Sequence, residues 1–109
     1  MIDWTRVNEL RDEIGADNLE EVVAMFLDEA DEVIARITQN DSAASLEADL
    51  HFLKGAALNL GFAEFAVLCQ NGERQAALGQ VGLDIAAVQD CYALSKSALS
   101  DGIMAQNAA

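Results

Sequence analysis

The one histidine of this chain, His51, is followed three residues later by Lys54 and four residues later by Gly55. A neutral imidazole is a nucleophile near pH 7, because its unperturbed pKa is about 6.5. Lys54 follows one helical turn along the same side, where its ammonium can neutralise negative charge on a phosphoryl group attached to the ring. We expect Gly55 to keep the space above the imidazole open, because any side chain there would crowd it and helix stability alone would favour alanine. On spacing alone, an ordinary surface histidine beside a lysine is the favoured interpretation. The glycine in the middle of a helix is what favours phosphoryl chemistry at His51 instead.

Composition excludes several other kinds of site. A single histidine rules out a metal site that needs two histidines, and we expect neither a metal nor a cofactor. Cys69 and Cys91 form no CxxC motif, and we expect both to be reduced thiols of the core. The sequence shows neither a secretory leader nor an apolar run that could cross a membrane, so we expect a cytoplasmic protein.

The net charge of −13 is unevenly distributed along the chain. Residues 1–50 carry a net charge of −11 and residues 51–109 a net charge of −2. An acidic surface repels nucleic acid and anionic lipid, so we expect neither a nucleic-acid nor a membrane partner. The less acidic second half is where we expect another protein or a phosphate to bind.

A second polar candidate, Glu73, lies in the middle of an apolar helical stripe. A carboxylate in such a place usually has a partner. If its helix packs beside that of His51, Glu73 can accept a hydrogen bond from Nδ1–H and leave Nε2 as the nucleophile. Pairing with Lys54 or Arg74, or a side chain that reaches water, are the alternatives. Gln70, one turn earlier, is the substitute candidate for orienting His51.

The pattern of apolar residues predicts an all-α fold. Spacings of three and four residues indicate helices at 3–14, 19–39, 43–60, 62–77 and 83–100, with breaks at 40–42 and 78–82 and a frayed end. Short connections and the lack of any strand pattern predict an antiparallel up-down four-helix bundle with a short N-terminal helix, as a single domain over residues 1–109.

The helix predicted at 43–60 positions the histidine. Its buried seam is expected to consist of Leu46, Leu50, Leu53, Ala57 and Leu60. At 100° per residue, His51 lies about 140° from Leu46, which directs the imidazole towards solvent. Gly61 is expected to end this helix.

These features resemble one known family. His51-x-x-Lys54-Gly55 followed by Gly61 is similar to the signature of histidine phosphotransfer (HPt) domains, as are Phe-Leu-x-Glu at 26–29 and Val-x-Glu-Leu at 7–10 with Gly15 and Asp17. The resemblance covers nearly the whole chain and implies that His51 accepts a phosphoryl group from a receiver-domain aspartate and passes it to another receiver. It also implies Lys54 as the neighbouring cation and Gly55 as the clearance residue. A polar residue at the position of Glu73 orients the histidine in that family.

The resemblance further implies the partners: response-regulator receiver domains and a hybrid histidine kinase. The receiver would supply the aspartate and Mg²⁺, so we expect no intrinsic kinase activity from this chain. We expect the partner to dock over the third and fourth helices, with Glu47, Leu58 and Phe62 among the contacts. Phe62 departs from many members, which have a small residue there, and this leaves its local packing open.

Two alternatives differ in class. A non-catalytic acidic adaptor would bind signalling partners without needing His51. The dimerisation segment of a histidine kinase would need an acidic residue directly after the histidine and then a proline. Here Phe52 follows His51 and proline is absent, so the kinase segment is excluded.

Overall fold

The computed structural model describes residues 1–39 and 42–108, with side chains up to residue 106. The chain forms five helices: α1 (Trp4–Ile14), α2 (Ala16–Ile37), α3 (Ala43–Leu60), α4 (Ala63–Ala77) and α5 (Ile85–Ala108). Within the described residues there is no strand, and the one β-bridge pairs Ile2 with Phe62. The all-α prediction is confirmed.

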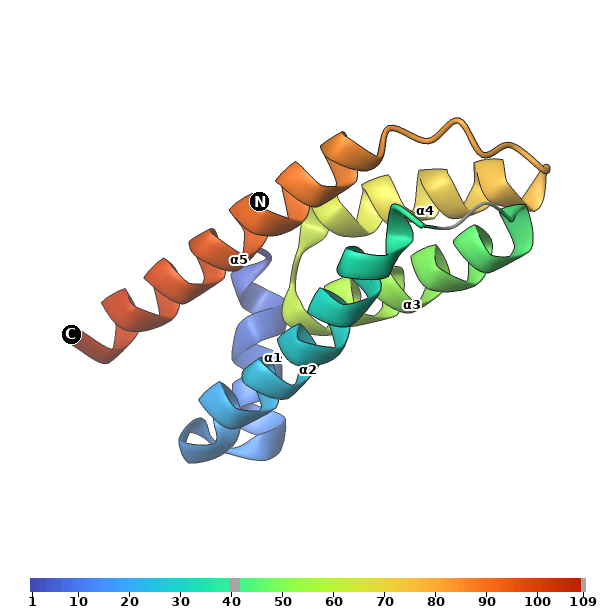
Figure 1. The fold of residues 1–109 in the computed structure, drawn as a ribbon. Helices are drawn as coiled ribbons and strands as arrows, with labels where there is room; N and C mark the ends of the chain where they lie inside the picture. Colours follow the sequence, from blue (N-terminus) through green and yellow to red (C-terminus); the bar gives the residue numbers. More distant parts are fainter. Residues whose placement is uncertain (40–41, 109) are drawn as a thin grey trace.

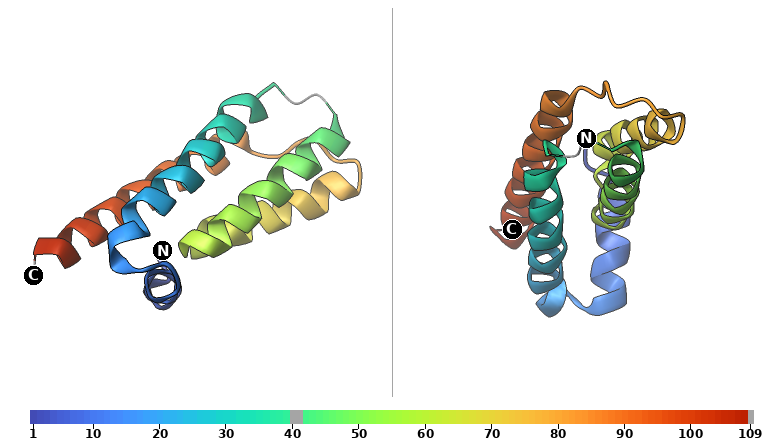
Figure 2. Two further views of the ribbon diagram at one scale, coloured as in Figure 1. Left: turned by 90° about the horizontal axis from the view of Figure 1, so that it is seen from below. Right: turned by 45° about the vertical axis from the view of Figure 1, so that its right-hand side comes forward.

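Helices α2 to α5 lie side by side, and each reverses the direction of the one before it (Figure 1). Figure 2 shows α3 beside α4 and α5 beside α2, with α1 crossing the end of the group where α3 turns into α4. The last turns of α5 extend past this end (Figure 1). The helix that carries His51 therefore packs between α2 and α4.

The bounds of α3 match the predicted helix because both of its ends are set by local sequence. The Ser42 side chain accepts a hydrogen bond from the Ser45 N–H at 3.2 Å, and Gly61 takes the left-handed conformation with φ 74°. The predicted start of α2 is wrong by three residues. Gly15, with φ 88°, both ends α1 and caps α2, and its carbonyl accepts from the Asn18 N–H at 3.1 Å.

The predicted ends of the other helices differ from the observed ones by one residue or more. Helix α2 ends at Ile37, and of the predicted break at 40–42 residues 40 and 41 lie outside the described part of the chain. Helix α4 starts one residue later than predicted and α5 two residues later. The predicted end of the last helix at residue 100 is wrong, because α5 continues to Ala108, Ile103 is buried and Gly102 packs directly against the Trp4 ring.

The core confirms the predicted seam of α3. All five of its residues are buried, with Leu50 and Leu53 completely inaccessible. Tyr92 of α5 packs against Phe65 with ring centroids 5.3 Å apart. Its hydroxyl donates to Asp31 at 2.6 Å, and Lys96 pairs with the same carboxylate at 2.9 Å, which connects α5 to α2.

Among the described residues, no helix combines the length and the apolar character that crossing a membrane requires.

Candidate functional site

His51 projects from the middle of α3 away from the core. Its side chain is 70% exposed, whereas its neighbour Leu50 is fully buried. This exposure confirms the orientation predicted from the helical pattern. The ring is nonetheless held, because Nδ1 lies 2.7 Å from Glu73 Oε1 on α4.

Gly72 explains how α4 brings Glu73 within reach. A Cβ at position 72 would lie 3.0 Å from Leu50 Cδ1 and 3.2 Å from Leu83 Cδ1, tighter than ordinary contact. A glycine inside a helix lowers its stability by about 1 kcal/mol relative to alanine. Here it permits α4 to approach α3 closely, and the next residue, Glu73, meets the side chains of His51 and Lys54.

Lys54 pairs with the second oxygen of the same Glu73 carboxylate. Its Nζ lies 2.8 Å from Glu73 Oε2, and the two side chains are 25% and 20% exposed. The hydrogen bond from Lys54 lowers the pKa of Glu73 below its usual value, with a smaller contribution from His51, although burial opposes the shift. Glu73 is therefore ionised at neutral pH.

An ionised carboxylate can only accept, so Nδ1 of His51 must carry the proton in this bond. In the neutral ring the lone pair then lies on Nε2, the nitrogen furthest from Glu73. The geometry thus offers a nucleophilic nitrogen on an exposed ring, an ionised group behind the ring and an ammonium one turn away.

The expectation that any side chain at Gly55 would crowd the imidazole is wrong for alanine. A Cβ built at this position meets no atom within 4 Å. The carbonyl of Gly55 also accepts a hydrogen bond from Asn59 Nδ2 at 3.0 Å. Any clearance that Gly55 provides therefore concerns an incoming group and not the histidine itself.

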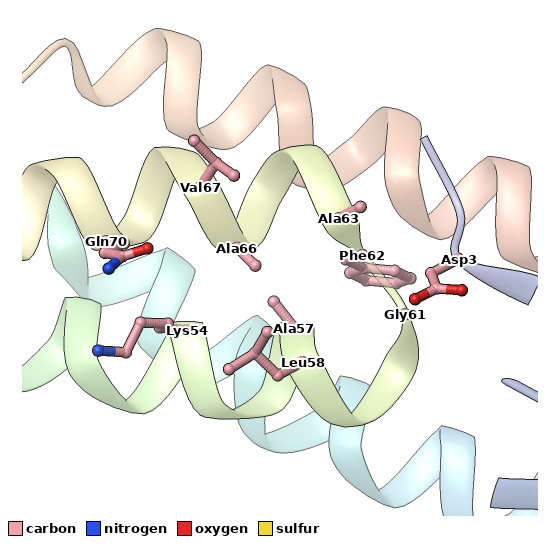
Figure 3. A pocket seen from close by; sticks show the side chains of 10 residues that line it. All are labelled: Asp3, Lys54, Ala57, Leu58, Gly61, Phe62, Ala63, Ala66, Val67 and Gln70. Carbon is pink, nitrogen blue, oxygen red and sulfur yellow. The ribbon is translucent and has the colours of Figure 1, made fainter. Parts of the chain in front are cut away.

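A groove between α3 and α4 begins beside Lys54 (Figure 3). Lys54 and Gln70 lie at one end of this groove, Leu58 near its middle and Asp3 at the other end. Gln70 lines this groove together with Lys54, and Nδ1 of His51 is bonded to Glu73 and not to Gln70. Leu58 is 59% exposed.

Two of the predicted docking residues are less accessible than Leu58. Glu47 is half-buried. The expectation that Phe62 is a docking contact is wrong, because its side chain is only 1% exposed. The backbone bridge to Ile2 covers this turn, and the Phe62 ring packs 6.4 Å from that of Tyr92 in an edge arrangement. The large side chain thus fills the end of the core.

The sequence reasoning missed three residues at the edges of the site. Phe52, directly after His51, is 39% exposed, and Val67 of α4 is exposed beside the groove. Both lie opposite apolar seams, a signal that the helical pattern contains. Asp3 reaches the groove because its N–H donates to the Gly61 carbonyl at 2.7 Å, a tertiary contact without a local sequence signal.

Among the described residues, no group of three or more His, Cys, Asp or Glu side chains is arranged to hold a metal ion.

Comparison with known proteins decides the family. The family model of the Hpt domain matches residues 21–103, which is well over half of the chain. This chain belongs to the Hpt-domain family. Searches of curated proteins and of solved structures gave no significant match. As an Hpt-domain protein, the chain has a phosphotransfer role in two-component signalling, in which such domains work with receiver domains and histidine kinases.

Proposed function

We propose that His51 accepts a phosphoryl group on Nε2 from the phosphorylated aspartate of one receiver domain and donates it to the aspartate of another. The observation that carries this proposal is the 2.7 Å bond between Nδ1 and Glu73 on a ring that is 70% exposed. The bond fixes which nitrogen is free, and the exposure gives an acyl phosphate access to it.

The transfer needs no proton to move. The Nε2 lone pair attacks phosphorus, the bond from phosphorus to the aspartyl oxygen breaks, and the carboxylate leaves with the electron pair. The ring keeps its Nδ1 proton and becomes positively charged, and ionised Glu73 stabilises that charge at 2.7 Å. The same steps in reverse deliver the phosphoryl group to the next receiver.

The α3–α4 hairpin provides the proposed docking face on the antiparallel four-helix bundle. His51 and Leu58 are exposed on this hairpin, and Leu58 lines the groove that begins at Lys54. Lys54 stands at the groove beside them, and this half of the chain is the less acidic one. We propose that receiver domains of response regulators and of a hybrid histidine kinase bind here and bring the aspartate and Mg²⁺.

The test replaces the nucleophile. His51→Gln should abolish uptake of labelled phosphate from a phosphorylated receiver, because no other histidine exists in the chain. The substitution is at an exposed position, so the free energy of unfolding should change by no more than about 0.5 kcal/mol. Label on the variant would contradict the proposal, and so would a wild type that takes no label from any receiver of its own organism.

The adaptor alternative is tested by binding and labelling with a receiver, and the proposed lack of kinase activity is tested by a separate incubation with ATP. An adaptor binds a receiver equally well with or without His51 and carries no label in either form. Incubation of the chain alone with labelled ATP should leave it unlabelled, and incorporation would contradict the proposed role as a passive carrier.

A further inference from the structure

In the unphosphorylated protein the carboxylate of Glu73 accepts from the His51 ring and pairs with the Lys54 ammonium. Glu73 contacts His51 through Oε1 at 2.7 Å and Lys54 through Oε2 at 2.8 Å. The lysine that would stabilise a phosphoryl group on Nε2 is therefore already paired before any phosphoryl group arrives. Its position beside His51 does not by itself make it available.

Phosphorylation changes the charges at both ends of this network. A phosphoryl group at neutral pH carries between about −1.5 and −2 charges, more than the single charge of Glu73. At the same time the ring, which keeps its Nδ1 proton, gains a positive charge next to Oε1. Glu73 then has a cation of its own, and the strongest uncompensated negative charge lies on the oxygens of the phosphoryl group bound to Nε2, one turn from Lys54.

The two side chains differ in their freedom to respond. Lys54 has a flexible four-carbon stem and is 25% exposed, so its ammonium can move along the surface without opening the core. Glu73 follows Gly72, where even an added Cβ would lie only 3.0 Å from Leu50 Cδ1, and its shorter side chain also holds the ring. Lys54 is therefore the partner that moves.

We propose that Glu73 is a positioning residue with two successive states: it holds both His51 and Lys54 at rest, and on phosphorylation it keeps the ring while Lys54 transfers to the phosphoryl oxygens. This inference rests on the proposed phosphorylation of His51. Glu73 thereby pairs with Lys54 in the resting protein and gives up this ion pair when His51 becomes phosphorylated.

Lysine NMR provides a direct test, because Lys54 and Lys96 are the two lysines of the chain. Lys96 pairs with Asp31 at 2.9 Å, away from the site, and is an internal control. We would phosphorylate labelled protein with phosphoramidate, whose P–N bond breaks as the Nε2–P bond forms and whose amino group leaves as ammonia. The Nζ and Cε signals of Lys54 should shift on phosphorylation while those of Lys96 stay in place. An unshifted Lys54 would overturn the inference.

Glu73→Gln separates the two contacts of the carboxylate. The amide oxygen can still accept from Nδ1–H, but a neutral amide is no counter-ion for Lys54. In E73Q the ring nitrogens should keep the wild-type tautomer, and the resting Lys54 signals should differ from wild type. After phosphorylation the Lys54 signals of the two proteins should converge. Coincident Lys54 signals in the two resting proteins would contradict the shared-carboxylate state.

A double-mutant cycle of Lys54 and Glu73 tests the same inference through the rate of phosphoryl uptake. Lys54→Ala should slow uptake from phosphoramidate more in the E73Q background than in wild type, by a further factor of about three or more, because Lys54 no longer has to leave a carboxylate. Equal factors in both backgrounds would overturn the inference.

Phosphoramidate needs no receiver. A protein that accepts phosphate from phosphoramidate but from no receiver would refute the proposed partners and leave this inference standing.

Discussion

Gly55 is the residue where fold and proposed chemistry make opposite demands. An added Cβ meets no atom within 4 Å, and alanine is more favourable than glycine inside a helix by about 1 kcal/mol. Gly55→Ala should therefore raise the free energy of unfolding by up to that amount. The same methyl group would stand on the face that a receiver approaches, and displacing the reacting atoms by even about 1 Å can slow a reaction by about 100-fold.

The measurements are urea unfolding and the rate of phosphoryl transfer from a receiver to G55A. We expect a more stable protein with transfer slowed by roughly ten-fold or more. A variant that is stabilised and transfers at the wild-type rate would show that Gly55 provides no clearance.

Glu73 should also make folding stability depend on pH in the acid range. The hydrogen bond from Lys54 is the main cause that lowers its folded pKa below the usual 4.5, with His51 adding to it against the effect of burial. A carboxyl group with a lowered folded pKa contributes stability that is complete above its unfolded pKa and is lost as the pH falls through the folded value. In E73Q the free energy of unfolding should fall less steeply below about pH 4.5 than in wild type. Parallel curves for the two proteins would contradict the assigned pairing.

The site residues show which contacts the sequence could predict. Glu73 was found because a carboxylate within an apolar stripe needs a partner, and the structure gives it both His51 and Lys54, which had stood as alternatives. Phe62 was misassigned because its orientation depends on the pairing of Ile2 with the α3–α4 turn. A helical pattern cannot contain that information, since the two segments are far apart in the chain.

At the scale of helices, local signals predicted α3 but not the end of α5. Ser42 and Gly61 fix both ends of α3 from within their own segment. Helix α5 continues past residue 100 because its last turns pack against α1, where Gly102 meets the Trp4 ring. Such a contact between opposite ends of the chain has no local signature in the sequence.

Gly102→Ala tests this contact, and G55A is its matched control. A Cβ at position 102 would overlap two atoms of the Trp4 ring, so the ring or α5 must move. Overpacking of this kind typically lowers the free energy of unfolding by about 1–3 kcal/mol. Replacing glycine by alanine inside a helix raises it by only about 1 kcal/mol, so the net effect should be destabilising. We expect G102A to be destabilised where G55A is stabilised. Trp4 is the only tryptophan, so its fluorescence emission should also shift to the red in G102A alone.

At the scale of the molecule, the family match begins at residue 21 and leaves α1 outside it, yet α1 is joined to the rest by contacts of several kinds. The Asp3 N–H bonds to the Gly61 carbonyl at 2.7 Å, and Arg6 donates to Asn59 at 3.4 Å. Trp4 packs on α5, and two residues of α1, Val7 and Leu10, belong to the buried core cluster of the described residues. These contacts lead us to expect that α1 unfolds together with the other helices.

If α1 belongs to the same folding unit as the other helices, its unfolding cannot precede that of the bundle. Small domains with one core unfold in a single cooperative transition, for which different probes give the same curve. Trp4 fluorescence reports on α1, and far-UV circular dichroism is dominated by the four longer helices, α2 to α5. The two urea transitions should therefore coincide in midpoint and steepness. If α1 were a separate appendage, the fluorescence change would come first, at lower urea, while the helical signal remained intact. His51 lies two to three turns from the Gly61 turn that Asp3 covers, so coincident curves would also mean that loss of α1 unfolds the phosphotransfer site with it.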